Sequence, residues 1–281
     1  MPMNYVRMGT GEPLLMLHGL GGSWRSWSTI LGPLRQQRDL VLVDLPGFGE
    51  TPPLSHETSI LTLADSVTTF LGENGLYGID VVGSSMGARL AMELARRGVV
   101  GATVALDPGG FWRGWQRTFF YRSIWASIRL VRLLQPVMPA LCGSAAGRTL
   151  LFPQFSPKPW ALTGEAVLEE MRSYAGATRF DQLLASLAYG PEQEGAPRGS
   201  LKKPLVIGWG RQDRVCLPSQ AGVALHLFPD AGMHWFNRCG HFPHWDQPEE
   251  TVGMILANTG AGLDRHPVAP ATARAGTTAG V

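Results

Sequence analysis

The chain has 281 residues, of which 44% are hydrophobic and only 16% are charged. These proportions exclude a chain that is disordered throughout, and the length is sufficient for a large buried core. The 24 Lys and Arg residues nearly balance the 22 Asp and Glu residues, so a globally basic nucleic-acid-binding protein is not expected. No apolar run reaches the roughly 18 residues of a membrane span, and the first residues lack the apolar core of a signal peptide. We therefore expect a cytoplasmic protein without a transmembrane segment.

Five short apolar segments are typical of strands that are buried on both faces: 14–17, 40–43, 79–82, 99–106 and 204–207. The first leads into His18-Gly19, and each of the others is followed by Gly or Asp. Helix-forming stretches lie between them, including 61–71 and 88–96. This alternation predicts an α/β fold with a mostly parallel central sheet flanked by helices. The polar and glycine-rich stretches HGLGG, DLPGFGE, GSSMG, LDPGG and GWGRQDR all follow predicted strands, at the edge where such sheets hold their ligands.

The alternation of strands and helices breaks within 111–200, which is helix-forming but contains no convincing strand. We expect this segment to be a helical cap inserted into a core formed by 1–110 and 201–259. The segment 260–281 is rich in Ala, Gly, Thr and Pro, and we expect a disordered tail there.

The sequence GSSMG at 83–87 fits the G-x-S-x-G pattern, and it lies between a predicted strand and a predicted helix. A sharp turn of this kind strains the backbone of the central residue, so small residues must flank it, and the following helix directs its free amides toward the site. The pattern predicts that Ser85 is a nucleophile.

A serine hydroxyl needs a base, and the base needs a carboxylate that orients it. Asp213 follows the predicted strand 204–207, and His241 lies further along in CGHFPHWDQPEE. We therefore predict that Ser85, Asp213 and His241, in this order along the chain, form a catalytic triad.

Other residues of the same types compete for two of these roles. His244 is expected to pack or cap on a following helix, and His234 to lie in a strand. Asp107 ends the strand before the cap and is a rival for the acid, but we prefer Asp213 because glycine and proline frame its loop.

The segment HGLGG at 18–22 predicts the second element of an oxyanion hole, because its glycines allow backbone amides to approach a substrate oxygen. The expected donors are the backbone N–H groups of Leu20 and Met86. His18 is expected to be structural, bonding to nearby backbone.

These segments together resemble the α/β-hydrolase superfamily, in particular the capped group that includes carboxylesterases, carbon–carbon bond hydrolases and cofactor-free haloperoxidases. The matching segments are HGLGGSWRSW, DLPGFGET, VVGSSMGARLAMELA, GWGRQDRVCLP and CGHFPHWDQPEE, in family order. The resemblance implies a helical cap inserted after the sixth family strand, and it implies chemistry without a cofactor. Relatives that hydrolyse epoxides or carbon–halogen bonds have Asp at the position of Ser85, which argues against both reactions.

The cap has an uneven composition that bears on its partners. From 108 to 164 there is no Asp or Glu, whereas aromatic residues and arginines are frequent. The stretch 120–134 predicts an amphipathic helix with Phe120, Ile124 and Ile128 on its apolar face. Its other face carries Arg122, Arg129 and Arg132, which are either only solvated or attract an acidic carrier protein or an anionic surface.

The aromatic residues of the cap predict an apolar pocket for a hydrophobic small molecule. We expect Trp24, Phe111, Trp112 and Phe242 to contact it. The main hypothesis is a serine hydrolase that cleaves an ester, thioester or similar acyl bond through an acyl-enzyme. Carbon–carbon hydrolysis of a vinylogous diketone, acyl transfer, and ligand binding without turnover are the alternatives.

No cofactor and no metal site are expected. The three cysteines, Cys142, Cys216 and Cys239, form no CxxC pair, and we interpret them as reduced structural thiols.

Overall fold

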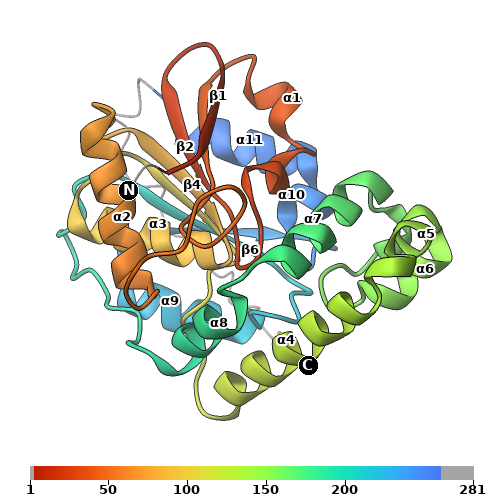
Figure 1. Ribbon diagram of the computed structural model, residues 1–281. Helices are drawn as coiled ribbons and strands as arrows, with labels where there is room; N and C mark the ends of the chain where they lie inside the picture. Colours follow the sequence, from red (N-terminus) through yellow and green to blue (C-terminus); the bar gives the residue numbers. More distant parts are fainter. Residues whose placement is uncertain (1–2, 261–281) are drawn as a thin grey trace, which may run out of the picture.

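A seven-stranded sheet runs through the centre of residues 3–260, the part of the chain that the computed structural model describes (Figure 1). The strands are β1 (Tyr5–Gly9), β2 (Pro13–Leu17), β3 (Asp39–Val43), β4 (Asp80–Ser84), β5 (Thr103–Leu106), β6 (Leu205–Gly210) and β7 (Gly232–Phe236). Their order across the sheet is β1-β3-β2-β4-β5-β6-β7, and every neighbouring pair is parallel except β1 with β3. The predicted α/β fold with a mostly parallel sheet is confirmed.

Alternating side chains of each central strand enter two different hydrophobic cores. In β2, Leu15 and Leu17 join the core on one face of the sheet, whereas Leu14 and Met16 join the core on the other. All four side chains are fully buried. Successive residues of a strand point to opposite faces, so a continuous apolar run is stable only when helices cover both faces.

Helices supply that cover and also form a separate group over one edge of the sheet. They are α1 (Leu31–Leu34), α2 (Ile60–Glu73), α3 (Met86–Arg97), α4 (Trp115–Leu133), α5 (Met138–Gly143), α6 (Ala145–Leu151), α7 (Gly164–Gly176), α8 (Phe180–Tyr189), α9 (Ala221–Leu227), α10 (Pro243–Asp246) and α11 (Pro248–Asn258). Helices α2, α3 and α9 contribute to the first core, and α1 and α11 to the second. Figure 1 shows α4 to α8 grouped on one side of the molecule, away from β1 and α1.

The segment predicted to be a helical insertion, 111–200, holds α4 to α8 between β5 and β6. Within this group α4 packs against α7 and α8, and α5 packs against α6 and α7. Helix α7 also contacts the short 3-10 helix η1 (Trp24–Trp27) of the core. The insertion is therefore joined to the sheet domain by packing as well as by its two chain connections.

The sheet differs from the sequence-based expectation at two strands. The apolar run 99–106 forms a strand only from Thr103, because Gly98 ends α3 with a φ of 69° and Gly101 turns the chain against β4. A Cβ at Gly101 would lie 2.5 Å from a carboxylate oxygen of Asp80. Strand β1 was not anticipated, because an exposed antiparallel edge strand has no continuous apolar run.

Two further expectations concern the ends of the chain and the membrane. The segment 260–281 was predicted to be a disordered tail, and all of it except Gly260 lies outside the described residues. None of the helices within residues 3–260 combines the length and the apolar character needed to cross a bilayer.

Candidate active site

Ser85 lies at the turn between β4 and α3, in a backbone conformation that few residues other than glycine adopt. Its φ is 55° and its ψ is −112°. The turn is sharp enough that neither flanking glycine can carry a side chain. A Cβ at Gly83 would lie 2.1 Å from the carbonyl oxygen of Gly87, and one at Gly87 would lie 2.1 Å from that of Leu17. The G-x-S-x-G spacing is thus a steric requirement of this strained turn.

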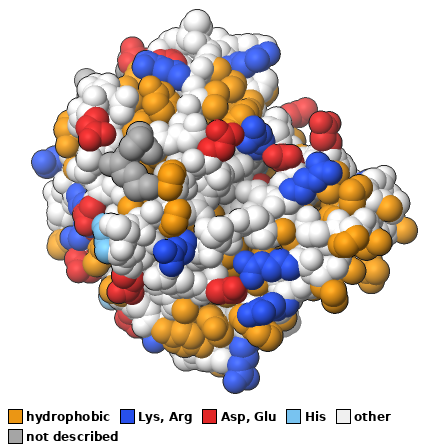
Figure 2. Space-filling model, in the orientation of Figure 1, with side chains coloured by type: hydrophobic (Ala, Val, Ile, Leu, Met, Phe, Trp, Pro, Cys, Tyr) orange, Lys and Arg blue, Asp and Glu red, His pale blue; other side chains and the backbone are white. Residues whose placement is uncertain are grey.

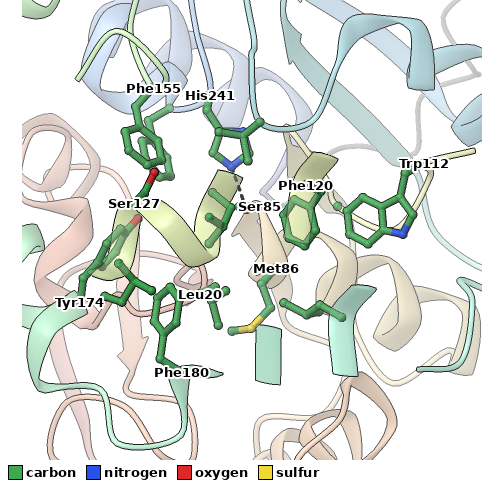
Figure 3. Close-up of a pocket in the computed structure, with 16 residues that line it drawn as sticks. Leu20, Ser85, Met86, Trp112, Phe120, Ser127, Phe155, Tyr174, Phe180 and His241 are labelled. Carbon is green, nitrogen blue, oxygen red and sulfur yellow. Dashed lines mark hydrogen bonds between the residues drawn. The ribbon is translucent and has the colours of Figure 1, made fainter. Parts of the chain in front are cut away.

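Three side chains from separate loops meet at this turn. The Oγ of Ser85 lies 2.8 Å from Nε2 of His241 (Figure 3). On the other side of the ring, Nδ1 of His241 lies 2.8 Å from Oδ2 of Asp213. The side chains of His241 and Asp213 are almost completely buried. These are the hydrogen bonds that a serine nucleophile, a base and an orienting carboxylate require.

The loops that carry the acid and the base are themselves held by backbone hydrogen bonds. The second oxygen of Asp213 accepts the N–H groups of Val215 and Cys216, at 2.7 and 3.1 Å. The N–H of His241 donates to the carbonyl of Phe155 in the insertion, at 2.8 Å. Both oxygens of the Asp213 carboxylate therefore accept hydrogen bonds. The position of the imidazole depends partly on the insertion.

Two backbone amides next to Ser85 are available to bind an oxyanion. Leu20 and Met86 line the same pocket as Ser85, and within residues 3–260 neither N–H donates a hydrogen bond to the protein. The loop of Leu20 lies directly against the turn of Ser85, since a Cβ at Gly19 would be in van der Waals contact with the Cβ of Ser85 at 3.4 Å. Free donors beside the nucleophile are the arrangement that stabilises a tetrahedral intermediate.

His18 belongs to the scaffold of this loop. Its Nδ1 lies 2.7 Å from the carbonyl oxygen of Gly19, and its Nε2 accepts the N–H of Leu45 at 3.0 Å. Burial lowers the pKa of His18, which favours the neutral ring that these two bonds need. Its predicted structural role is confirmed.

The competing histidines lie away from Ser85. His244, on α10, is buried against Trp27 with 5.0 Å between ring centroids, and burial followed by the charge of His241 lowers its pKa to about 3. His234 lies in β7 and pairs with Glu250 at 2.9 Å. Neither histidine makes a hydrogen bond to the serine within the described residues, so His241 is the imidazole at the site.

The competing acid, Asp107, lies close to Asp213 but makes different contacts. Its Oδ1 accepts the N–H of Gly210 at 2.8 Å, and its Oδ2 has no partner within the described residues. Burial, and then the charge of Asp213, raise the pKa of Asp107 well above its ordinary value. The sequence leaves Asp107 and Asp213 as alternative candidates for the acid, whereas the structure places both carboxyls in one buried cluster.

An apolar pocket lies over Ser85 between the sheet domain and the insertion (Figure 3). Its hydrophobic lining is Leu20, Met86, Trp112, Phe120, Ile124, Ile128, Phe155, Tyr174, Phe180, Leu187, Val215 and Phe242. Helix α4 contributes Phe120, Ile124 and Ile128 to this wall, so the apolar face predicted for this helix lines the pocket. Among the described residues that line it, none is Lys, Arg, Asp or Glu.

Of the four residues expected to contact the substrate, the structure places two in the wall of this pocket and two elsewhere. Trp112 and Phe242 line the pocket, whereas Trp24 and Phe111 do not. Phe111 is buried against Trp209 and Phe228, which draw it into the sheet domain. Trp24 packs into the core on the opposite face of the sheet, where Arg25 stacks over its ring.

Three side-chain contacts, of which the first and third are buried, fasten the insertion to the site. The first joins Ser26 to Glu170 of α7, with the Ser26 hydroxyl donating to the carboxylate at 2.6 Å. The Ser173 hydroxyl donates to the carbonyl of Gly21 at 2.8 Å. The third contact joins Ser156 to Asp246, whose other oxygen accepts the N–H of Gly240. The second and third of these contacts reach the oxyanion loop and the loop of His241, and neither was visible in the sequence.

The cysteines are free and buried, as predicted. Cys216 lies close enough to Asp213 and His241 for the three to resemble a metal-binding group. Burial raises the pKa of the Cys216 thiol, which disfavours the thiolate that a metal would need. The carboxylate and the imidazole are already hydrogen-bonded to each other, and this contact accounts for the cluster.

Some arginines of the insertion are paired with acidic residues, so its charge is less uniformly basic than the sequence predicts. Arg132 pairs with Asp181 of α8 at 2.9 Å, and Arg117 pairs with Glu192. Within residues 3–260, Arg122 and Arg129 have no acidic partner, and Arg129 stacks over Trp125 at 5.1 Å.

Comparison with known proteins identifies the family of the chain. A model described as the alpha/beta hydrolase family matches residues 14–254. The chain is 29% identical over 270 residues to the dihydrolipoyllysine-residue acetyltransferase component of an acetoin cleaving system of Cupriavidus necator, covering 92% of this chain and 66% of that protein. It is 30% identical over 271 residues to 2-hydroxy-6-oxononadienedioate/2-hydroxy-6-oxononatrienedioate hydrolase 1 of Dechloromonas aromatica, covering 90% and 89%.

Among solved structures, it is similar to a thermophilic esterase from Thermogutta terrifontis, with a TM-score of 0.65 and 19% identity over 91% of this chain and 92% of that one. This likeness concerns the fold. Because the family match extends from β2 into α11 and spans the insertion, the chain belongs to the alpha/beta hydrolase family.

Proposed function

We propose that the protein is a serine hydrolase that cleaves the acyl bond of a neutral, hydrophobic ester or thioester. The observation that carries the proposal is the hydrogen-bonded chain from Ser85 through His241 to Asp213, at 2.8 Å for each step, beneath an apolar pocket. The free amides of Leu20 and Met86 supply the oxyanion site beside it.

In the acylation step, Oγ of Ser85 forms a bond to the acyl carbon while Nε2 of His241 takes the hydroxyl proton. The carbonyl oxygen becomes an oxyanion and accepts the N–H groups of Leu20 and Met86. When the tetrahedral intermediate collapses, the bond to the leaving group breaks and His241 gives its proton to that group. Asp213 holds the imidazole in the tautomer with a proton on Nδ1 and stabilises its cation.

In the deacylation step, water occupies the place of the leaving group. His241 takes a proton from the water as the water oxygen attacks the acyl carbon. The second intermediate releases the carboxylic acid, and the proton on His241 returns to Oγ of Ser85. The balance is one water consumed, one acyl bond cleaved, and no change in oxidation state.

The lining of the pocket supports a neutral substrate. A carboxylate buried among apolar side chains without a cationic partner loses several kcal/mol of hydration. Because no described lining residue is Lys or Arg, an acyl group without charge fits this pocket better than an acidic one.

Carbon–carbon hydrolysis is the second candidate, supported by the 30% identity to the D. aromatica relative along 90% of this chain. The name of that relative specifies a dioate, which carries two carboxylates. The same triad can cleave a carbon–carbon bond, so the two candidates differ in what the pocket must bind. The apolar lining favours a neutral ester over an acidic dienoate as the substrate.

Parallel assays distinguish the two candidates. A series of p-nitrophenyl esters from acetyl to decanoyl is compared with a ring-cleavage dienoate that carries carboxylate groups. We expect ester turnover that Ser85→Ala abolishes and Ser84→Ala leaves intact, because the neighbouring Ser84 hydroxyl makes no hydrogen bond within the described residues. Efficient turnover of the dienoate together with negligible ester cleavage would transfer the assignment to carbon–carbon hydrolysis.

A further inference from the structure

The outer surface of α4 is unusual for a helix that covers an active site, because it exposes large apolar side chains. Helical periodicity places six exposed residues on one side of the helix: Trp115, Phe119, Arg122, Arg129, Leu130 and Leu133. We refer to these six residues as the outer cap face. Trp115 is 66% exposed and Leu133 is 75% exposed, although burial of such side chains is the norm.

The apolar surface continues at the end of the insertion formed by α5 and α6. Val137, in the 3-10 turn after α4, and Leu150, on α6, are both at least half exposed. Figure 2 shows hydrophobic side chains gathered over this end of the molecule, with Lys and Arg side chains beside them. Scattered exposed hydrophobic residues are normal, but a contiguous set on one side of a molecule indicates contact with another phase or partner.

The charges of this surface have one sign. Residues 108–164 contain no Asp or Glu. Arg122 and Arg129 lie within the outer cap face and have no acidic partner among residues 3–260, whereas the paired Arg132 and Arg117 lie outside it. An exposed, apolar and aromatic helix face with unpaired arginines complements an anionic lipid surface, where the apolar side chains enter the acyl boundary and the arginines contact headgroups.

We infer that the outer cap face docks the protein on an anionic bilayer. Helix α4 has 19 residues and is about 28 Å long, and it would lie in the plane of the interface. This interaction goes beyond the proposed hydrolysis, because it concerns the opposite side of the helix from Ser85.

The position of α4 gives the docking a consequence for substrate supply. Its inner side, with Phe120, Ile124 and Ile128, forms one wall of the pocket over Ser85. A docked α4 therefore separates the bilayer from the catalytic pocket by the width of one helix. A hydrophobic acyl compound dissolved in the bilayer would be concentrated next to the pocket that receives it.

Vesicle flotation tests the docking without depending on turnover. The full chain is mixed with vesicles of phosphatidylcholine alone or of phosphatidylcholine and phosphatidylglycerol in equal parts. We expect flotation with the anionic vesicles, at least tenfold weaker flotation with the neutral ones, and loss of binding in high salt.

Two double variants separate the apolar and the charged contributions. Leu130→Ser with Leu133→Ser, and Arg122→Glu with Arg129→Glu, should each reduce binding by about tenfold or more. Both pairs are on the surface, and thermal melts check that the variants fold. The matched controls, Tyr77→Ser and Arg35→Glu, change an exposed aromatic residue and an exposed arginine of the sheet domain and should bind as the wild type does.

The inference is overturned if the protein floats with neither vesicle, if it binds both equally, or if the outer-face variants bind as tightly as the controls. Light scattering tests the remaining alternative, which is that the outer cap face forms a dimer. A dimer that the leucine variant converts to a monomer would assign the outer cap face to a second copy of the chain and would also overturn the inference.

Discussion

Gly210 connects Asp107 to Asp213. Its N–H donates to Oδ1 of Asp107 at 2.8 Å, and its carbonyl accepts the N–H of Asp213 at 3.2 Å. Two acids from neighbouring strand ends are thereby held against the same residue, yet only Asp213 is hydrogen-bonded to His241. Burial, and then the negative charge of Asp213, raise the pKa of Asp107 and so disfavour a second negative charge beside the first.

Replacing the two acids by asparagine should separate their roles. Asp213→Asn should lower kcat by on the order of 10⁴-fold, because an amide disfavours the tautomer in which Nε2 of His241 accepts the serine proton. Asp107→Asn should lower kcat by less than about tenfold, since the amide oxygen can still accept the N–H of Gly210. Steady-state assays with one ester measure both. A larger loss for Asp107→Asn would make Asp107 the working acid.

The strained turn at the nucleophile makes a prediction about stability. Gly87→Ala should lower the free energy of unfolding by more than about 3 kcal/mol, because its Cβ would overlap the carbonyl of Leu17. Gly253→Ala is the matched control: it lies in α11 with open space around it, and it should stabilise the protein by about 0.5–1 kcal/mol. Urea unfolding measures both changes, and equal effects would contradict the geometry of the turn.

The contact between Ser26 and Glu170 predicts how stability varies with pH. Burial raises the pKa of Glu170 from 4.5 to about 7, although the hydrogen bond from Ser26 opposes the rise. A folded-state pKa above the unfolded value means that the folded protein binds more protons in this interval. The contribution of Glu170 is therefore most favourable below pH 4.5 and is lost as the pH rises through 7.

Glu170→Gln removes this titration. Relative to the wild type, the variant should gain on the order of 3 kcal/mol of unfolding free energy between pH 4.5 and pH 8. Glu165→Gln is the control, because this carboxylate lies in the same helix, is exposed, and is not in contact with Ser26. Parallel pH dependences for the wild type and Glu170→Gln would show that the buried carboxyl does not titrate in this range.

The parts of the site that the sequence predicts are those fixed by short-range spacing. A nucleophile between two glycines, after a strand and before a helix, fixes its own turn by local sterics, so Ser85 and the amide of Met86 could be placed from five residues. Asp213 and His241 could be ordered along the chain but not positioned. Asp107 also follows a strand, and only the register of β5 against β6 shows that it shares Gly210 with Asp213.

The failures concern side-chain direction and contacts between distant segments. Phe111 is next to Trp112 in the chain, yet one side chain packs against Trp209 and the other lines the pocket. No local pattern determines which of two adjacent aromatic residues turns inward. The partnership of Glu170 with Ser26 joins residues 144 positions apart, and nothing distinguishes Glu170 from the adjacent Glu169 in the sequence.

The wall formed by α4 predicts a change in acyl-chain selectivity. Ile128→Trp should lower kcat/KM for decanoyl esters relative to acetyl esters by about tenfold or more, because the larger side chain fills the pocket above the nucleophile. Leu130→Trp, on the exposed side of the same helix, should leave this ratio unchanged. An unaltered ratio in both variants would place the acyl group elsewhere.

The most direct test of the account is intact-mass labelling with a fluorophosphonate, which reacts only with an activated serine. The wild type should gain a single adduct that is absent from Ser85→Ala and present in Ser84→Ala. His241→Ala should label far more slowly, because it lacks the base that lies 2.8 Å from Oγ. Folded wild-type protein that gains no adduct, or an adduct that persists in Ser85→Ala, would contradict the assignment of Ser85 as the nucleophile.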